Sequence, residues 1–135
     1  MATFVMDSCS LLAALRGEEG ALTVRSLFAD NEHTCIVHAI NLGEVFYIVL
    51  RDHDEARAQQ ALDDLELLGL STNTDFDDQL WQTAGRIKAQ WRRISLADCF
   101  GIALSQRLRA TFVTADHHEL DALATAGVIK PLFIR

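Results

Sequence analysis

Short apolar runs alternate along this chain with longer segments in which apolar residues recur every three or four positions. The short runs predict buried strands at residues 3–6, 35–37, 70–72, 111–114 and 132–134. The longer segments predict helices at 8–15, 18–30, 42–51, 54–68, 75–91, 97–108 and 119–126. Strands that alternate with helices in this order indicate an α/β fold with a parallel sheet covered on both faces.

Local signals at the helix ends support these boundaries. Ser95 followed by Asp98 has the form of an N-terminal capping box, and Asn41 is a candidate cap for the helix at 42–51. Gly69 and Gly127 follow two of the helical segments, where glycine commonly ends a helix. These signals predict that Glu44 and Asp98 both lie near the start of a helix.

The chain has 135 residues, of which half are hydrophobic and one is proline, and it contains no low-complexity stretch. This length suits one domain spanning residues 1–135. No apolar run approaches the roughly 20 residues of a membrane-spanning helix, so we expect a cytoplasmic, soluble protein without a membrane partner. The three cysteines, Cys9, Cys35 and Cys99, are far apart and fit buried thiols better than disulfides.

The net charge of −7 argues against a protein that holds nucleic acid by bulk electrostatics. It does not exclude a nuclease whose carboxylates are gathered in one pocket and neutralised by divalent ions. A dense basic cluster precedes Asp98 and consists of Arg86, Lys88, Arg92 and Arg93. This cluster could guide an RNA backbone, or it could be an ordinary solvated helix face.

Four acidic residues lie where predicted strands end or helices begin. Asp7 and Asp116 directly follow strands, while Glu44 and Asp98 fall in the first turns of helices. In a parallel sheet the carboxyl ends of the strands and the following helix N-termini share one edge. Each acid alone could be a cap or a turn residue. As a set, in otherwise apolar segments, they predict one shared acidic site.

A cluster of carboxylates needs a cation, and hard oxygen ligands without accompanying His or Cys favour Mg²⁺ or Mn²⁺ over Zn²⁺. Such ions supply a metal-bound water as nucleophile and stabilise the attacking and leaving oxygens at phosphorus. This chemistry requires no nucleophilic side chain. The acidic set therefore predicts a divalent-metal site that can support hydrolysis at phosphorus.

Four segments of the chain resemble motifs of the PIN-domain family, and within it the VapC-type toxin ribonucleases of type II toxin-antitoxin modules. They are FVMDSCSLLAAL, NLGEV, LADCFGIALSQ and ATFVTADHHEL, in this order along the chain. The resemblance covers nearly the whole sequence. It implies a three-layer α/β/α sandwich with a central, mainly parallel sheet of four to five short strands.

The resemblance also implies Mg²⁺- or Mn²⁺-dependent cleavage of RNA. By motif position, Asp7, Glu44, Asp98 and Asp116 would be the catalytic metal ligands. Ser8 and Thr114 stand where the family often has hydroxyl residues that support the site. Toxin members bind a cognate antitoxin protein and commonly form homodimers, so we expect both partners here.

Some roles around the site stay open at this level. Many relatives carry a further acid two residues after the fourth, whereas this chain has His118 there and offers Glu119 or Asp121 nearby. His117 and His118 fit either proton transfer or a solvated turn. A patch on the mid-chain helices could receive an antitoxin or a second copy.

Trp81 and Trp91 fit a core or an interface better than base stacking. Which RNA is the target is not readable from the sequence.

Two rival functions can be weighed from the sequence. A phosphoacceptor receiver domain often has a Lys-Pro pair, as at Lys130-Pro131, but the third strand has no aspartate at its end and too few residues follow Pro131 for a closing helix. A PIN-like domain that binds RNA or protein without cutting is the stronger rival. Because all four acids are present, we favour catalysis.

Overall fold

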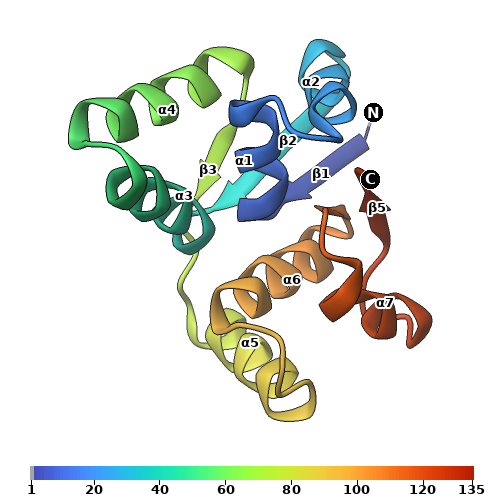
Figure 1. Ribbon diagram of the computed structural model, residues 1–135. Helices are drawn as coiled ribbons and strands as arrows, with labels where there is room; N and C mark the ends of the chain where they lie inside the picture. Colours follow the sequence, from blue (N-terminus) through green and yellow to red (C-terminus); the bar gives the residue numbers. More distant parts are fainter. Residues whose placement is uncertain (1) are drawn as a thin grey trace.

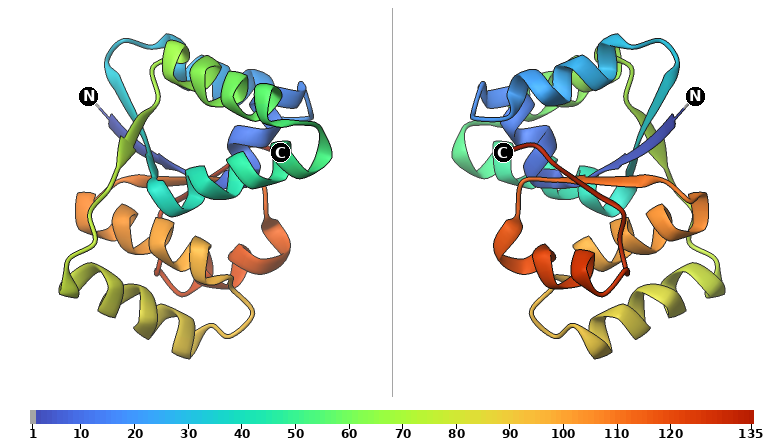
Figure 2. Two further views of the ribbon diagram at one scale, coloured as in Figure 1. Left: turned by 90° about the vertical axis from the view of Figure 1, so that its left-hand side faces the viewer. Right: turned by 90° about the vertical axis from the view of Figure 1, so that its right-hand side faces the viewer.

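The computed structural model describes residues 2–135, which form a five-stranded parallel sheet with helices on both faces (Figures 1 and 2). The strands are β1 (Ala2–Met6), β2 (His33–His38), β3 (Ser71–Asn73), β4 (Thr111–Thr114) and β5 (Pro131–Phe133). The helices are α1 (Ser8–Arg16), α2 (Ala21–Ala29), α3 (Ala39–Asp52), α4 (Glu55–Leu68), α5 (Asp78–Gln90), α6 (Leu96–Leu108) and α7 (His117–Thr125). The predicted α/β class and the parallel sheet are confirmed.

The sheet order is β3-β2-β1-β4-β5, and every neighbouring pair is parallel. All strands therefore end at the same edge of the sheet. Side chains alternate between the two faces, as the geometry of a strand requires. In β1, Phe4 and Met6 pack in the core beneath α1 to α4, whereas Val5 packs in the core beneath α5 to α7. Figure 2 shows the resulting three layers.

Most predicted elements are found within a few residues of their expected positions, but several helix starts differ. The cap of α3 is His38, whose Nδ1 accepts from the Ile40 amide at 3.2 Å, so the prediction that Asn41 caps this helix is wrong. Because α3 starts at Ala39, Glu44 lies in its second turn and not in the first. An N-cap needs an extended backbone, which residue 38 has at the end of β2.

Three further helices begin away from their predicted starts. Helix α5 begins at Asp78 after its cap Asp77, three residues later than expected, and α7 begins at His117 after its cap Asp116. Helix α2 begins at Ala21, because Gly20 adopts φ +94° and lies against Ile134. A Cβ at residue 20 would stand 2.7 Å from the Ile134 carbonyl oxygen, so only glycine fits there.

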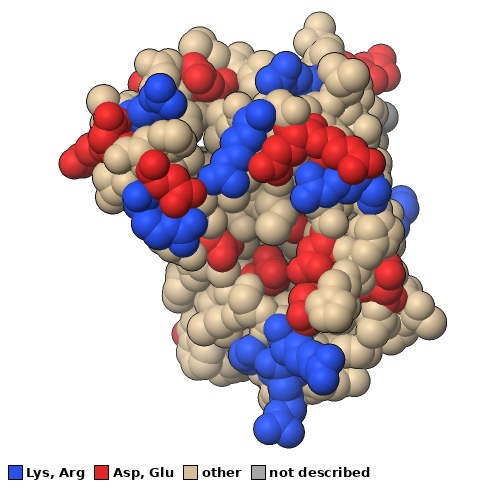
Figure 3. Space-filling view, in the orientation of Figure 1, with Lys and Arg blue, Asp and Glu red and all other residues tan. Residues whose placement is uncertain are grey.

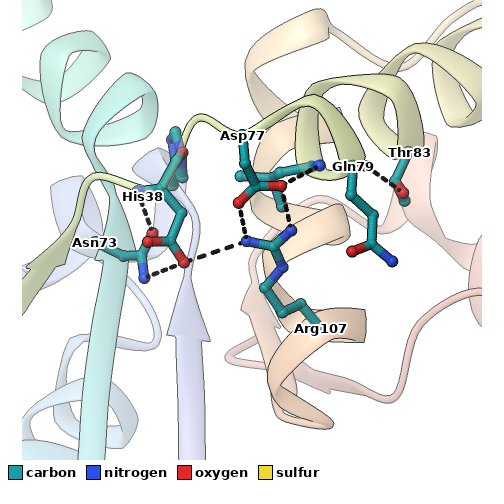
Figure 4. A network of polar contacts seen from close by, with 8 residues as sticks. His38, Asn73, Asp77, Gln79, Thr83 and Arg107 are labelled. Atoms are coloured by element: carbon teal, nitrogen blue, oxygen red, sulfur yellow. Dashed lines mark hydrogen bonds and ion pairs between the residues drawn. The ribbon is translucent and has the colours of Figure 1, made fainter.

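The crossover from β3 to α5 carries the chain from one layer of helices to the other, and polar contacts fix it (Figure 4). Arg107 of α6 donates to both carboxylate oxygens of Asp77, at 2.6 and 2.7 Å, and to Asp75 at 3.4 Å. The Nε2 of buried His38 lies 2.9 Å from the Asp75 carbonyl oxygen.

No helix among residues 2–135 is long and apolar enough to cross a membrane.

Candidate functional site

The strand order reverses at β1, whose neighbours are β2 on one side and β4 on the other. In open parallel sheets, ligands bind beyond the carboxyl ends of the strands at such a reversal. Asp7 directly follows β1, and Asp116 follows β4 by two residues. The first and last of the predicted acids therefore stand on adjacent strands at the edge where a ligand is expected.

Asp7 is almost fully buried, with 1% of its surface exposed, and it caps α1. The Ser10 amide donates to Asp7 Oδ1 at 2.8 Å, and the Ser10 hydroxyl donates to the Asp7 carbonyl oxygen at 2.9 Å. Burial raises the pKa of Asp7 to about 6, although hydrogen bonds from Thr114 and Ser10 oppose the rise. This carboxyl group is rigidly placed and poorly solvated.

Asp98 lies in the first turn of α6, whose cap Ser95 accepts from the Asp98 amide at 3.1 Å. Burial, followed by repulsion from Asp7 and Glu44, raises the pKa of Asp98 to about 7. On α3, the Oε1 atom of Glu44 is buried and has no hydrogen-bond partner among the described residues. A hydrogen bond with Ser95 opposes the rise at Asp98, whereas Glu44 Oε1 lacks the partner that a buried charge normally has.

Asp116 caps α7 by accepting from the Glu119 amide at 3.1 Å, and its own amide donates to the Thr114 hydroxyl at 3.0 Å. Thr114, which is fully buried, thus holds Asp116 and also bonds to Asp7. Ser8 is buried in the first turn of α1, next to Asp7 in the chain. Thr114 therefore has contacts that fit its predicted supporting role.

The surroundings of the Cys9 thiol indicate that the four acids lie close to one another. Cys9 is exposed, so the prediction of a buried thiol is wrong for this residue, whereas Cys35 and Cys99 are buried. Desolvation raises the pKa of Cys9 to about 12, and the charges of Asp7, Asp98, Asp116 and Glu44 all add to the rise. A thiol held protonated in this way is a poor nucleophile. Figure 3 shows acidic side chains gathered in a hollow between the upper and lower layers of helices.

Asn41 is a part of this site that the sequence reasoning missed. It is fully buried one turn before Glu44 on α3, and its Nδ2 donates to the Ala97 carbonyl oxygen at 3.0 Å. This bond joins α3 to the first turn of α6, next to Asp98. The only signal in the sequence was a polar residue on the same helical face as Glu44, three positions earlier.

The donor set fits a hard divalent cation, which carboxylate oxygens bind in preference to other ligands. Two of the acids have raised proton affinity, and a third has a buried oxygen without a partner, so each would gain from a nearby positive charge. As they stand, no three His, Cys, Asp or Glu side chains in residues 2–135 are grouped so as to hold a metal ion.

The candidates for a further ligand differ in their surroundings. Asp121 is exposed and its Oδ1 lies 2.9 Å from Nδ1 of His117, whose Nε2 lies 2.7 Å from the Arg135 carbonyl oxygen. His117 also stacks on Phe133, with ring centroids 3.9 Å apart. These contacts anchor the C-terminal strand. Glu119 is 29% exposed at the start of α7, one turn from Asp116.

The predicted basic cluster lies beside the hollow, where Figure 3 shows basic side chains below the acidic ones, over the end of α5 and the loop after it. Arg86, Arg92 and Arg93 are exposed. Lys88 differs, because its Nζ donates to the carbonyl oxygens of Arg92 at 2.9 Å and Ile94 at 2.7 Å. Lys88 therefore fixes the loop that carries two of the arginines.

Comparison with protein families gives a match to the PIN domain over residues 4–125. The chain is similar in structure to a DNA-bound VapBC from Salmonella typhimurium, with a TM-score of 0.76 and 16% identity over 100% of both chains. It is also similar to VapBC2 from Rickettsia felis bound to a promoter DNA fragment, with a TM-score of 0.74 and 18% identity over 97% of this chain and 98% of the other.

A third similar structure is VapC20 from Mycobacterium tuberculosis, described as a toxin that cleaves the sarcin-ricin loop. Here the TM-score is 0.70, with 17% identity over 96% of this chain and 98% of the other. A comparison with curated proteins gave no match. At such low identities the structural likeness shows a shared fold.

Proposed function

The chain belongs to the PIN-domain family, and from this premise we propose that it is a Mg²⁺- or Mn²⁺-dependent endoribonuclease. The observation that carries the proposal is the meeting of Asp7, Glu44, Asp98 and Asp116 from four different elements at the reversal point of the sheet. Burying several carboxylates close together is costly unless a cation compensates them. A protein that only needed stability would not concentrate these charges.

In this proposal the four carboxylates hold the metal, directly or through water, and the bound ion supplies an activated water and neutralises charge developing at phosphorus. Ser10 and Thr114 orient Asp7, Thr114 also holds Asp116, and Asn41 keeps the turn bearing Asp98 against α3. Because the carboxyls of Asp7 and Asp98 bind protons tightly, metal binding has to displace protons and weakens at acidic pH.

We further propose that the enzyme is the toxin of a toxin-antitoxin pair. The similar structures include VapBC toxin-antitoxin complexes, which supports an antitoxin protein as partner. Exposed apolar side chains on the mid-chain helices, Tyr47 and Leu50 on α3 with Leu67 and Leu68 on α4, offer surface for an antitoxin or for the second copy of a homodimer.

The alternative is a PIN-like domain that binds RNA or protein without cutting. The observation in its favour is that no three ligating side chains among residues 2–135 are grouped for a metal ion. Catalysis is preferred because none of the four acids is replaced.

The test is a thermal melt titrated with Mg²⁺ and Mn²⁺, combined with a cleavage assay on transfer, ribosomal and messenger RNA. Wild type is expected to gain several degrees in Tm and to cleave only with metal. Asp7→Asn is expected to lose at least about 100-fold in cleavage rate, because it removes a ligand charge. Asp64→Asn, an exposed change on α4, is the matched control and should behave as wild type. Metal binding without cleavage of any of these RNAs would favour the binding domain.

A further inference from the structure

A cavity of about 350 Å³ lies between the loop that joins α5 to α6 and the first turns of α7. Its walls include Trp91, Arg92, Arg93, His118, Glu119 and Ala122. This volume is within the range of small-molecule binding sites. The lining combines an aromatic ring, two guanidinium groups and polar side chains.

The cavity adjoins the acidic site through both of its walls. One wall ends at Ile94, and Ser95 then caps the helix whose first turn carries Asp98. The opposite wall begins with His118 and Glu119, directly after the α7 cap Asp116. A polymer lying across the carboxylates would therefore reach this cavity within a short distance.

The loop that forms one wall is fixed before any ligand arrives. Lys88 donates to two of its carbonyl oxygens, and the Ile94 amide donates to the Trp91 carbonyl oxygen at 3.0 Å. The Trp91 amide donates back to Ile87 at 2.8 Å. Trp91 is half-buried and packs partly against the core below α5 and α6. Because the Trp91 side chain is already held by this packing, it loses little conformational entropy when a ligand binds against its ring.

The arginines of this wall have no acidic partner. Within residues 2–135, Arg16, Arg51, Arg107 and Arg135 form ion pairs with carboxylates, whereas none is found for Arg92 and Arg93. In a chain with net charge −7, acidic partners are plentiful. Arg25, Arg57, Arg86 and Arg109 have no ion pair among these residues either, so it is the position of Arg92 and Arg93 in the cavity wall that sets them apart. Two unpaired guanidinium groups in one wall suit an anionic ligand that approaches from outside.

We propose that this cavity binds the base of an unpaired RNA nucleotide close to the bond that is cut, an inference that rests on the proposed ribonuclease function. Trp91 provides the surface against which the base stacks, and Arg92 and Arg93 contact the flanking phosphates. Unpaired bases of RNA are commonly held on aromatic rings, whereas paired bases are hidden in the duplex. The cavity thus selects single-stranded segments.

The test measures binding of a fluorescein-labelled single-stranded 12-nucleotide RNA by anisotropy with Mg²⁺, with Asp7→Asn in every protein so that the RNA stays intact. Adding Trp91→Ala is expected to weaken binding about 10-fold, the size of one lost stacking contact. Trp91→Phe keeps a ring and should stay within about 3-fold. Trp81→Ala, a half-exposed tryptophan on α5 outside the cavity, is the matched control and should change nothing.

Two comparisons separate base from phosphate contacts. On an RNA of the same length without bases, the difference in affinity between Trp91→Ala and its parent should disappear. Arg92→Gln should reduce the slope of log affinity against log salt by about 0.7, the value for one phosphate contact on a single strand, while Trp91→Ala leaves the slope unchanged. Equal binding of the normal RNA by Trp91→Ala and its parent, or an equal loss on base-free RNA, overturns the inference.

Failure of this inference can be told apart from failure of the ribonuclease proposal. In proteins that keep Asp7, Trp91→Ala should raise KM about 10-fold with kcat within about 3-fold. Cleavage with an unchanged KM would overturn the cavity and leave the nuclease standing, and absence of cleavage in wild type would overturn the nuclease. If Trp91→Ala does not fold, Trp91→Leu keeps apolar volume without a ring and serves the same comparisons.

Discussion

At the scale of single residues, the site depends on polar side chains that hold the acids in place. Ser10 and Thr114 fix Asp7 and Asp116 through short hydrogen bonds within the turns after β1 and β4. Asn41 works across a longer sequence distance, because its amide reaches the Ala97 carbonyl on another helix. Small polar residues of this kind set the geometry of a charged site without contributing charge.

Asn41→Ala is expected to lower the free energy of unfolding by about 0.5–1.5 kcal/mol, because the part-buried hydrogen bond that joins α3 to the Ala97 carbonyl oxygen of α6 is lost. Cleavage should fall by at least about 10-fold, since Asp98 is then less firmly placed. Urea unfolding and cleavage kinetics measure the two effects. Asn31→Ala, on an exposed loop, is the control. Full activity in a destabilised Asn41→Ala protein would show that the bond serves folding alone.

At the scale of elements, the crossover between β3 and α5 combines a helix cap with an ion pair. Asp77 accepts from the Leu80 amide at 3.0 Å as the cap of α5, and the same carboxylate receives the two bonds from Arg107. One side chain thus starts a helix and ties it to α6. This arrangement positions α5, whose far end carries Trp91.

Asp77→Ala is expected to lower Tm more than Arg107→Gln does, because the first change removes both the cap and the ion pair. Raising the salt concentration should shrink the effect of Arg107→Gln, while most of the Asp77→Ala effect remains. Thermal melts at low and high salt test this order, with Asp78→Ala as the neighbouring exposed control. An equal Tm loss in both variants would mean that the cap contributes nothing beyond the ion pair.

At the scale of the whole molecule, the carboxylates gathered at one edge of the sheet destabilise the folded state when they are ionised and no cation is bound. Burial and mutual repulsion raise the pKa of Asp7 to about 6 and that of Asp98 to about 7, from an ordinary value of 3.8. The folded state therefore binds protons more tightly than the unfolded state at both groups. Protonation and divalent-ion binding both offset the burial and repulsion of these carboxylates. The free energy of unfolding should therefore depend on pH and on metal concentration in a coupled way.

In EDTA, the free energy of unfolding is expected to fall as the pH rises from about 4 to about 7, because the stabilisation by bound protons is present below the unfolded pKa and is lost through the folded values. Asp98→Asn should flatten this dependence and stabilise the metal-free protein at about pH 8 by about 1–3 kcal/mol, while abolishing cleavage. Chemical unfolding across this pH range measures it. Cleavage at the wild-type rate would show that Asp98 is not a metal ligand.

Much of this architecture was predictable from local sequence. The apolar runs gave the strands, with β4 at its predicted bounds, and Ser95 gave the start of α6. Glu44 was misplaced by one turn, because the cap of α3 is a histidine at the end of β2, which is not a typical capping residue. Lys88 was grouped with the RNA-binding arginines, although it bonds to the loop that follows α5.

The sequence by itself determined the order of strands and helices and the position of Asp7, Asp98 and Asp116 at their junctions, because strand and helix periods and turn chemistry are local properties of the chain. The parallel arrangement then brings those junctions to one edge. Only the tertiary structure decided which distant groups meet there: Asn41 with Ala97, His117 with Phe133, and Trp91 with the start of α7. Such contacts depend on how helices pack across the sheet, and no spacing along the chain encodes them.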